Sequence, residues 1–133
     1  EIPFPDESFD YVFIHDVLHH IDEKNQDRSL HTKALNEMGR VLKKTGMLII
    51  VEGNRYNPLF YPHMVLLKGH NHFRQRYFKD IVSGVYPNVK FKFIECHVYP
   101  QKFIKFWKLY EKFMESFVPR NFLSYNVAII RKE

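Results

Sequence analysis

The N-terminal part of the chain has a pattern of apolar and polar positions that predicts a strand, a helix and a second strand. Residues 9–14 (FDYVFI) are a short β-rich run bounded by polar residues, and residues 47–51 (MLIIV) are a second such run. Between them, over about residues 28–44, apolar side chains recur at the spacing of an amphipathic helix. Both runs are almost continuously apolar, which predicts strands buried on both faces, as in a parallel sheet.

The residues at the two ends of this helix agree with its prediction. Asp27 or Ser29 can accept hydrogen bonds from the first backbone amides, and Lys43 and Lys44 suit the negative C-terminal end. Gly46 suits the left-handed backbone position that often follows a helix.

The carboxyl ends of the two predicted strands carry polar side chains. His15 and Asp16 follow the first strand, and Glu52 and Asn54 follow the second. Strand, helix and strand at this spacing predict a parallel pair with a right-handed crossover, so both strands end at the same edge of the sheet. Ligands of open α/β sheets bind at that edge, and the four side chains are expected to face one crevice. Position alone leaves an alternative equally open, in which Asp16 caps the next turn and His15 is a solvated loop residue.

The second half of the chain predicts an irregular segment followed by further helices and strands. Residues 55–72 contain two prolines, a glycine and many apolar side chains, which indicates an irregular or partly helical insertion; it either covers a substrate or is a surface loop with a packed underside. Residues 73–85 predict a helix, residues 89–98 a strand with one more solvent-exposed face, and residues 124–130 a last strand. The expected buried face of the helix consists of Phe78, Ile81, Val82 and Val85.

Residues 102–118 predict the clearest amphipathic helix of the chain, which Pro119 ends. Lysines dominate one face and aromatic side chains the other. The commoner use of such an aromatic face is to pack on a sheet or to form a lid over a pocket, and the alternative is contact with a membrane surface. The aromatic face consists of Phe103, Phe106, Trp107, Tyr110, Phe113, Met114 and Phe117.

The composition fits one globular domain. Of the 133 residues, 45% are hydrophobic, which excludes a disordered chain, and 17% are aromatic, which suggests a core or pocket built from rings. The net charge of +5 is spread along the chain, so an acidic partner or a membrane surface is compatible with it but not required. Cys96 is the only cysteine, which excludes an internal disulfide and makes the reducing cytoplasm the expected compartment.

Several short motifs within residues 2–54 together resemble the class I S-adenosylmethionine-dependent methyltransferases. That family often has a Leu-Pro-Phe turn, a strand that begins with Phe-Asp, a Leu-His-His element and a helix that ends in Glu-x-x-Arg-Val-Leu-Lys-Pro-Gly-Gly. The matching residues are Ile2-Pro3-Phe4, Phe9-Asp10, Leu18-His19-His20 and Glu37-x-x-Arg40-Val41-Leu42-Lys43, with Lys44-Thr45 in place of Pro-Gly. The order and spacing of the motifs carry the match, which is nearest to the branch that methylates small molecules and lipids.

This resemblance implies a fold, a cofactor and residue roles. The expected fold class is α/β: the C-terminal half of a Rossmann-like methyltransferase sheet, with about four strands, the last two antiparallel, and flanking helices. The implied cofactor is S-adenosylmethionine. The implied roles are cofactor contact for His15, Asp16 and Val17, catalysis as a base for His19 or His20, and acceptor binding for Glu52, Asn54, Arg55 and Tyr56. The alternative for each histidine is a structural hydrogen bond.

The glycine-rich cofactor loop of the resembled family has no counterpart among the 5 glycines, because no two of them are close enough to form it. The chain, residues 1–133, is therefore expected to be a partial domain: a fragment, a truncated gene product or one piece of a split protein. The strand at residues 9–14 would then lack a neighbour, and such an apolar edge invites a homodimer.

The sequence supports two functions of different classes. The first is methyl transfer to a small or lipid-like acceptor by the complete parent protein, with residues 55–72 and 102–118 as a substrate lid. The second is a degenerate, non-catalytic domain that binds a partner through its open strand edge and aromatic helix. Whether the chain is itself an enzyme stays open.

Two kinds of ligand are not expected from the sequence. A metal site is disfavoured because adjacent imidazoles at His19 and His20 point apart on a helix, and because no cysteine or carboxylate completes a familiar spacing with them or with His70 and His72. Nucleic acid is not expected as a partner because no recognition motif accompanies the basic charge.

Overall fold

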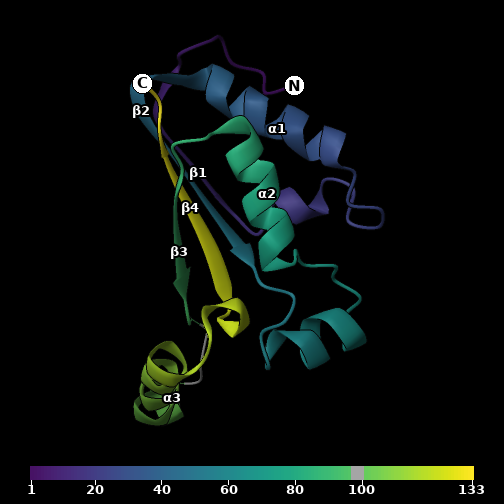
Figure 1. Cartoon of the computed structure of the whole chain (residues 1–133), viewed down its shortest axis with the longest axis vertical. Helices are drawn as coiled ribbons and strands as arrows, with labels where there is room; N and C mark the ends of the chain where they lie inside the picture. Colours follow the sequence, from purple (N-terminus) through teal and green to yellow (C-terminus); the bar gives the residue numbers. More distant parts are fainter. Residues whose placement is uncertain (97–100) are drawn as a thin grey trace.

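The computed structural model describes residues 1–96 and 101–133, which form a four-stranded mixed sheet with helices (Figure 1). The strand order is β1-β2-β4-β3; β1 and β2 are parallel, and β4 runs antiparallel to both β2 and β3. The predicted fold class, with its last two strands antiparallel, is therefore confirmed. The elements are β1 (Phe9–His15), α1 (Arg28–Val41), β2 (Leu42–Gly53), α2 (Gln75–Val85), β3 (Lys90–Ile94), α3 (Ile104–Phe117) and β4 (Tyr125–Arg131).

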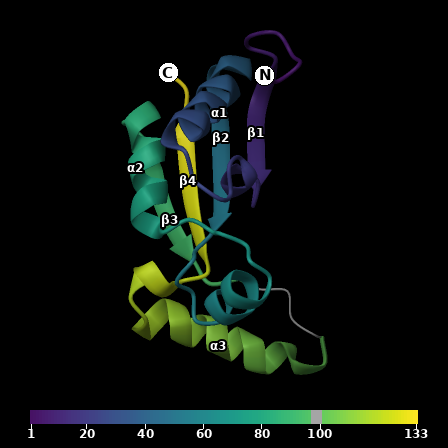
Figure 2. The same ribbon diagram turned by 90° about the vertical axis from the view of Figure 1, so that its right-hand side faces the viewer.

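Helices α1 and α2 lie side by side on one face of the sheet and cover its core (Figures 1 and 2). Three of the four side chains expected to form the buried face of α2 are buried, and Val85 packs against the same core while partly exposed. The centre of this core consists of Leu18, Leu35, Met38, Leu42, Leu48, Ile50, Phe73, Phe78, Ile81, Val82, Ala128 and Ile130. The apolar periodicity of the helices therefore identified their packed faces.

Helix α1 begins as predicted, because the Asp27 carboxylate accepts a hydrogen bond of 2.7 Å from the Ser29 backbone N–H. It ends earlier than predicted, at Val41, and β2 starts directly at Leu42, which pairs with Phe9 of β1. The chain at Leu42 pairs with β1 instead of forming the last predicted turn of the helix.

The turn after α1 also differs from the prediction. Thr45 has the positive φ of 66° that Gly46 was expected to have. Gly46 is instead required by a close approach, since a Cβ on it would lie 2.8 Å from Leu42 Cδ1. The last carbonyls of the helix region are bonded by Lys132, whose Nζ donates to the oxygens of Gly39 and Leu42 at 2.8 and 2.6 Å. Lys43 pairs with Asp10 of β1 instead.

Strand β1 is not buried on both faces, which corrects the prediction. The side chains of Tyr11 and Phe13 are 73% and 63% exposed. The physical reason is the position of the strand, because β1 is an edge strand of the described sheet. Among the described residues, helices α1 and α2 cover the face opposite to the one on which Tyr11 and Phe13 lie (Figure 2).

Helix α3 crosses the end of the sheet toward which β1 and β2 point (Figure 2). Its aromatic face does not pack on the sheet, which was one of the two commoner uses predicted for it, the other being a lid: Phe106, Phe113 and Phe117 are 62%, 53% and 77% exposed. Met114 is the buried residue of the helix. A helix laid across the end of a sheet is packed along one narrow stripe, so most of a broad aromatic face stays outside.

The segment between β2 and α2 contains a π-helical turn, Tyr61–Leu67, in agreement with a partly helical insertion. The predicted strand at 89–98 is shorter, Lys90–Ile94, and its residues 97 and 98 lie outside the described residues. No helix in the described ranges is long and apolar enough to cross a bilayer.

Candidate functional site

The carboxyl ends of β1 and β2 are joined through Asp16. Its backbone N–H donates to the Val51 carbonyl at 2.9 Å, and its Oδ1 accepts from the Gly53 N–H at 2.8 Å. Asp16 has a φ of 52°, a left-handed conformation that aspartate tolerates better than most residues. The tertiary structure therefore brings His15, Asp16, Glu52 and Asn54 to one edge of the sheet, as predicted, but the four side chains do not face one crevice, because Glu52 and Asn54 are 0% exposed.

Glu52 is fully buried and anchors the 3₁₀ turn Leu18–His20 that follows β1. Its Oε1 accepts from the backbone N–H groups of Val17 and Leu18 at 3.1 and 2.6 Å, and its Oε2 lies 2.7 Å from His19 Nδ1. Burial lowers the pKa of His19, but the hydrogen bond to Glu52 and its charge raise it more, so the net pKa lies above the ordinary value. The carboxylate thus fixes both the backbone of the turn and the ring of His19.

Asn54 is also buried and bonded within the protein. Its Nδ2 donates to the carbonyls of Asn121 and Leu123 at 2.8 Å each, which fastens the end of β2 to the segment before β4. The side chains of Glu52 and Asn54 therefore point inward and hold the framework of the edge, whereas Arg55 and Tyr56 after them reach surface cavities.

Four histidine rings form one compact cluster beside this edge, which overturns the reasoning that adjacent imidazoles point apart. The His19 and His20 ring centroids are 4.0 Å apart, because the residues lie on a 3₁₀ turn rather than an α-helix. His72 stacks beside His19 at 4.5 Å, and His70 lies 5.6 Å from His20. Carboxylates are also within reach, namely Asp16 on one side and Glu23 on the other.

The outer, more exposed part of the cluster, His20 and His70, is organised by Glu23. Its Oε2 lies 3.0 Å from His20 Nδ1, and its Oε1 lies 3.2 Å from His70 Nδ1. Burial raises the pKa of Glu23, but the backbone N–H of Asn71 and the neighbouring His20 lower it to about 2. An ionised carboxylate can only accept, so each of these histidines donates through Nδ1.

The inner part of the cluster, His19 and His72, is buried, and His72 is only 3% exposed. Neither of its ring nitrogens has a hydrogen-bond partner, and His19 Nε2 is likewise buried and unpaired. Burial, helped by the nearby charge of His19, lowers the pKa of His72 to about 4. Buried polar atoms without partners are rare in folded proteins, so this pair calls for an explanation.

Gly53 makes this arrangement sterically possible. A Cβ at position 53 would lie 2.6 Å from His72 Nδ1 and 3.3 Å from Asp16 Oδ1. Any other residue here would force the His72 ring out of this position.

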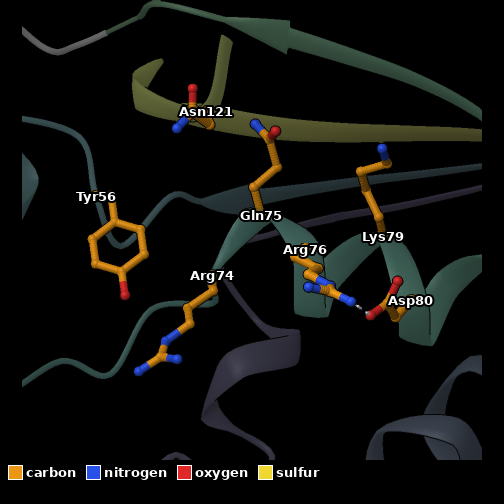
Figure 3. Close-up of a pocket in the computed structure, with 7 residues that line it drawn as sticks. All are labelled: Tyr56, Arg74, Gln75, Arg76, Lys79, Asp80 and Asn121. Carbon is orange, nitrogen blue, oxygen red and sulfur yellow. Dashed lines mark ion pairs between the residues drawn. The ribbon is translucent and has the colours of Figure 1, made fainter. Parts of the chain in front are cut away.

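The remaining predicted site residues are open to solvent. The side chain of His15 is 49% exposed and Val17 is 47% exposed. Tyr56 lines a cavity of about 400 Å³ whose other walls include Arg74, Arg76 and Lys79 (Figure 3). Arg55 lines a neighbouring cavity of about 560 Å³ and bonds to the side chain of Asn71.

Sequence reasoning did not assign roles to Glu23, His70, His72 and Arg74. A signal for two of them was present, since His70-x-His72 is a second close histidine pair. Nothing in the spacing showed that the two pairs meet. That contact depends on the path of the insertion between β2 and α2.

Comparison with known proteins agrees with this fold. Residues 1–50, which contain β1, α1 and most of β2, match a family model described as a methyltransferase domain. A comparison with curated proteins gave no match.

Solved structures with a similar fold include a SAM-dependent methyltransferase from Archaeoglobus fulgidus, with a TM-score of 0.62 and 17% identity, which covers 97% of this chain and 62% of that chain. A second, from Thermotoga maritima, is described as a SAM-dependent methyltransferase and possible histamine N-methyltransferase; its TM-score is 0.61 at 18% identity, covering 100% of this chain and 60% of that chain. The chain thus has the Rossmann-like fold of SAM-dependent methyltransferases and spans about 60% of the length of these two structures.

A third similar structure is that of the [4+2]-cyclase SpnF, with a TM-score of 0.60 and 15% identity, covering 99% of this chain and 52% of that chain. A protein described as a cyclase therefore shares this architecture with proteins described as methyltransferases. The reaction must be argued from the site, because one fold can host several reactions.

Proposed function

We propose that this chain provides the acceptor side of an S-adenosylmethionine-dependent methyltransferase that acts on a small or lipid-like molecule. The observation that carries the proposal is the convergence of His15, Asp16 and the Leu18–His20 turn at the joined carboxyl ends of β1 and β2. That edge is where ligands bind in open α/β sheets. The methyltransferase match over residues 1–50 includes the whole of β1 and the turn.

The residues at the end of β1 fit the methionine part of the cofactor. His15 and Val17 are each about half exposed, and Asp16 between them is held rigidly by Gly53. When bound, the cofactor would supply an electrophilic methyl group on a sulfonium. The chain's contribution would be to orient both reactants and to exclude water, which is the main demand of an in-line displacement.

Between the two histidines predicted to act as a base, the geometry favours His20. Its side chain is 47% exposed, whereas His19 is buried against Glu52. Because His20 Nδ1 donates to Glu23, its Nε2 is the nitrogen that can accept a proton from an acceptor hydroxyl or amine. Glu23 would stabilise the imidazolium that results.

The insertion at 55–72 and helix α3 are proposed as a lid over the acceptor. Both lie at the same end of the sheet as the Leu18–His20 turn (Figure 2). The exposed side of α3 presents an apolar surface that includes Phe106, Leu109 and Phe113. This apolar surface and the basic cavity around Tyr56 together suit an acceptor with an apolar part and an anionic part.

Calorimetric titration of the 133-residue chain with S-adenosylhomocysteine tests the proposal. Because the glycine-rich loop has no counterpart in this chain, we expect weak binding, in the submillimolar range, that falls at least tenfold in Asp16→Ala and stays unchanged in His63→Ala, an exposed histidine of the insertion. Absence of heat at millimolar ligand, with a folded chain, would contradict cofactor binding by this chain.

A second candidate is a partner-binding role, favoured by one observation: the outward face of β1 is exposed at an edge of the described sheet. Such an apolar edge can pair with a second copy of the chain. Light scattering at high concentration should then show a dimer that Tyr11→Lys disrupts. If the chain is monomeric and binds S-adenosylhomocysteine, the partner-binding role is contradicted and only the enzyme proposal remains.

A further inference from the structure

We propose that Asp16, His19 and His72 form a binding site for one transition-metal ion of the Zn²⁺ class. One ligand atom from each of these residues lies within 4.8 Å of the others. Modest side-chain rotations would bring the three atoms to bonds of roughly 2.0–2.2 Å around one ion.

The two imidazoles are prepared for a ligand that the protein itself does not provide. His19 Nε2 and both nitrogens of His72 are buried and lack hydrogen-bond partners, in residues that are 1% and 3% exposed. A histidine kept only for packing would cost stability here, because a buried polar atom without a partner is unfavourable. A metal ion would give a partner to His19 Nε2 and to one nitrogen of His72 at once.

The carboxylate behind His19 supports this assignment. Glu52 Oε2 lies 2.7 Å from His19 Nδ1, so the proton is held on Nδ1 and the lone pair is on Nε2. Metal-binding histidines usually donate their other N–H to a carboxylate in this way, which fixes the ring and increases its basicity. The backbone N–H groups of Val17 and Leu18 in turn hold Glu52.

The position of His72 is secured from two further directions. Phe60 stacks on its ring with centroids 5.9 Å apart, and Gly53 leaves the space that brings it close to Asp16. The Asp16 side chain is 30% exposed, so the third ligand connects the buried imidazoles to solvent.

The donor set indicates the kind of ion. Two imidazoles and one carboxylate suit Zn²⁺ or another first-row transition ion, whereas Mg²⁺ and Ca²⁺ prefer oxygen ligands. Three protein ligands leave at least one coordination position for water or for an oxygen of a bound molecule, as in catalytic rather than closed structural sites.

A second group of residues, His19, His20, Glu23 and His70, has ligand atoms equally close together. This group is more exposed, and the Nδ1 atoms of His20 and His70 are already bonded to Glu23. We therefore assign the ion to the inner group, and the experiment separates the two.

The experiment is a titration of the chelator-treated 133-residue chain with Zn²⁺ against a chromophoric competitor, and with Co²⁺ followed by its visible absorption. We expect one ion per chain, at least a 100-fold loss of affinity in His72→Ala and in Asp16→Asn, and no change with excess Mg²⁺. His70→Ala and the exposed His63→Ala are matched controls that should keep affinity within about threefold. Circular dichroism checks that each variant is folded. If His72→Ala does not fold, the affinity of Asp16→Asn tests the proposal in its place.

Three results would overturn the assignment. They are no binding at micromolar Zn²⁺, binding lost in His70→Ala but kept in His72→Ala, and binding that no single variant weakens. The first would leave the buried nitrogens without a metal, the second would move the ion to the outer group, and the third would indicate scattered surface histidines.

Discussion

The helix-covered core and the histidine-lined edge of the sheet both contain fully buried side chains, but for different reasons. In the core, Leu35 and Phe78 are 0% exposed among apolar neighbours. At the edge, Glu52 is 0% exposed as well, but among polar groups that it bonds. Burial in the core stabilises the fold by about 25 cal/mol per Å² of apolar surface. At the edge burial is costly unless each polar atom finds a partner, and neither ring nitrogen of His72 has one.

The largest effect is expected in the core. Phe78→Ala should lower the free energy of unfolding by about 3–5 kcal/mol, because it removes a fully buried ring and leaves a cavity. Urea unfolding followed by circular dichroism measures the loss. Phe117→Ala, at a position that is 77% exposed, is the matched control and should change stability by less than about 0.5 kcal/mol. Equal losses in both variants would mean that the core is misplaced.

At the edge, Glu52→Ala should lower the free energy of unfolding by about 2–4 kcal/mol, because it leaves two backbone N–H groups and the His19 ring without their hydrogen-bond acceptor. Glu52→Gln keeps one acceptor oxygen and should lose less than Glu52→Ala in the same unfolding assay. If both variants were as stable as the natural chain, the carboxylate would not be the anchor of the turn.

An effect of opposite sign is expected for the unpaired histidine. His72→Leu should leave the metal-free chain unchanged or raise its stability by about 1 kcal/mol, because an apolar side chain replaces a buried polar one that has no partner. His31→Leu is the control: His31 is also 0% exposed and its Nε2 has no partner, but its Nδ1 bonds Tyr77 at 2.8 Å, so the free energy of unfolding should fall by about 1 kcal/mol. A destabilised His72→Leu variant would show that His72 is part of the packing framework and not a free ligand.

The smallest effect concerns the opposite end of the sheet, where Glu37 pairs with Arg40 at 3.0 Å. Hydrogen bonds from Arg40 and from the Ile2 N–H lower the pKa of Glu37 to about 2, against an ordinary 4.5. The stabilisation is therefore complete above pH 4.5 and is lost as the pH falls toward 2. Unfolding measured between pH 6 and 2 should show a shallower loss of stability in Glu37→Gln than in the natural chain, and parallel curves would contradict the pairing.

Local sequence patterns predicted the scaffold well where one element decides its own structure. The strand–helix–strand order, the Asp27 cap and the buried face of α2 follow from side-chain periodicity and backbone capping. The patterns failed where neighbouring elements compete. The start of β2 depends on pairing with Phe9, and the exposure of Phe113 and Phe117 depends on where α3 rests.

The sequence by itself determined that polar residues follow both strands and that the chain has two close histidine pairs. Only the tertiary structure decided that these pairs meet. After the insertion, Phe73 forms a bridge with Asn54, and its carbonyl accepts from the Arg55 N–H at 3.0 Å. This return of the chain sets His72 against Gly53, where no Cβ stands in its way. Contacts between distant segments depend on such long-range backbone pairing, which the side-chain pattern of neither segment records.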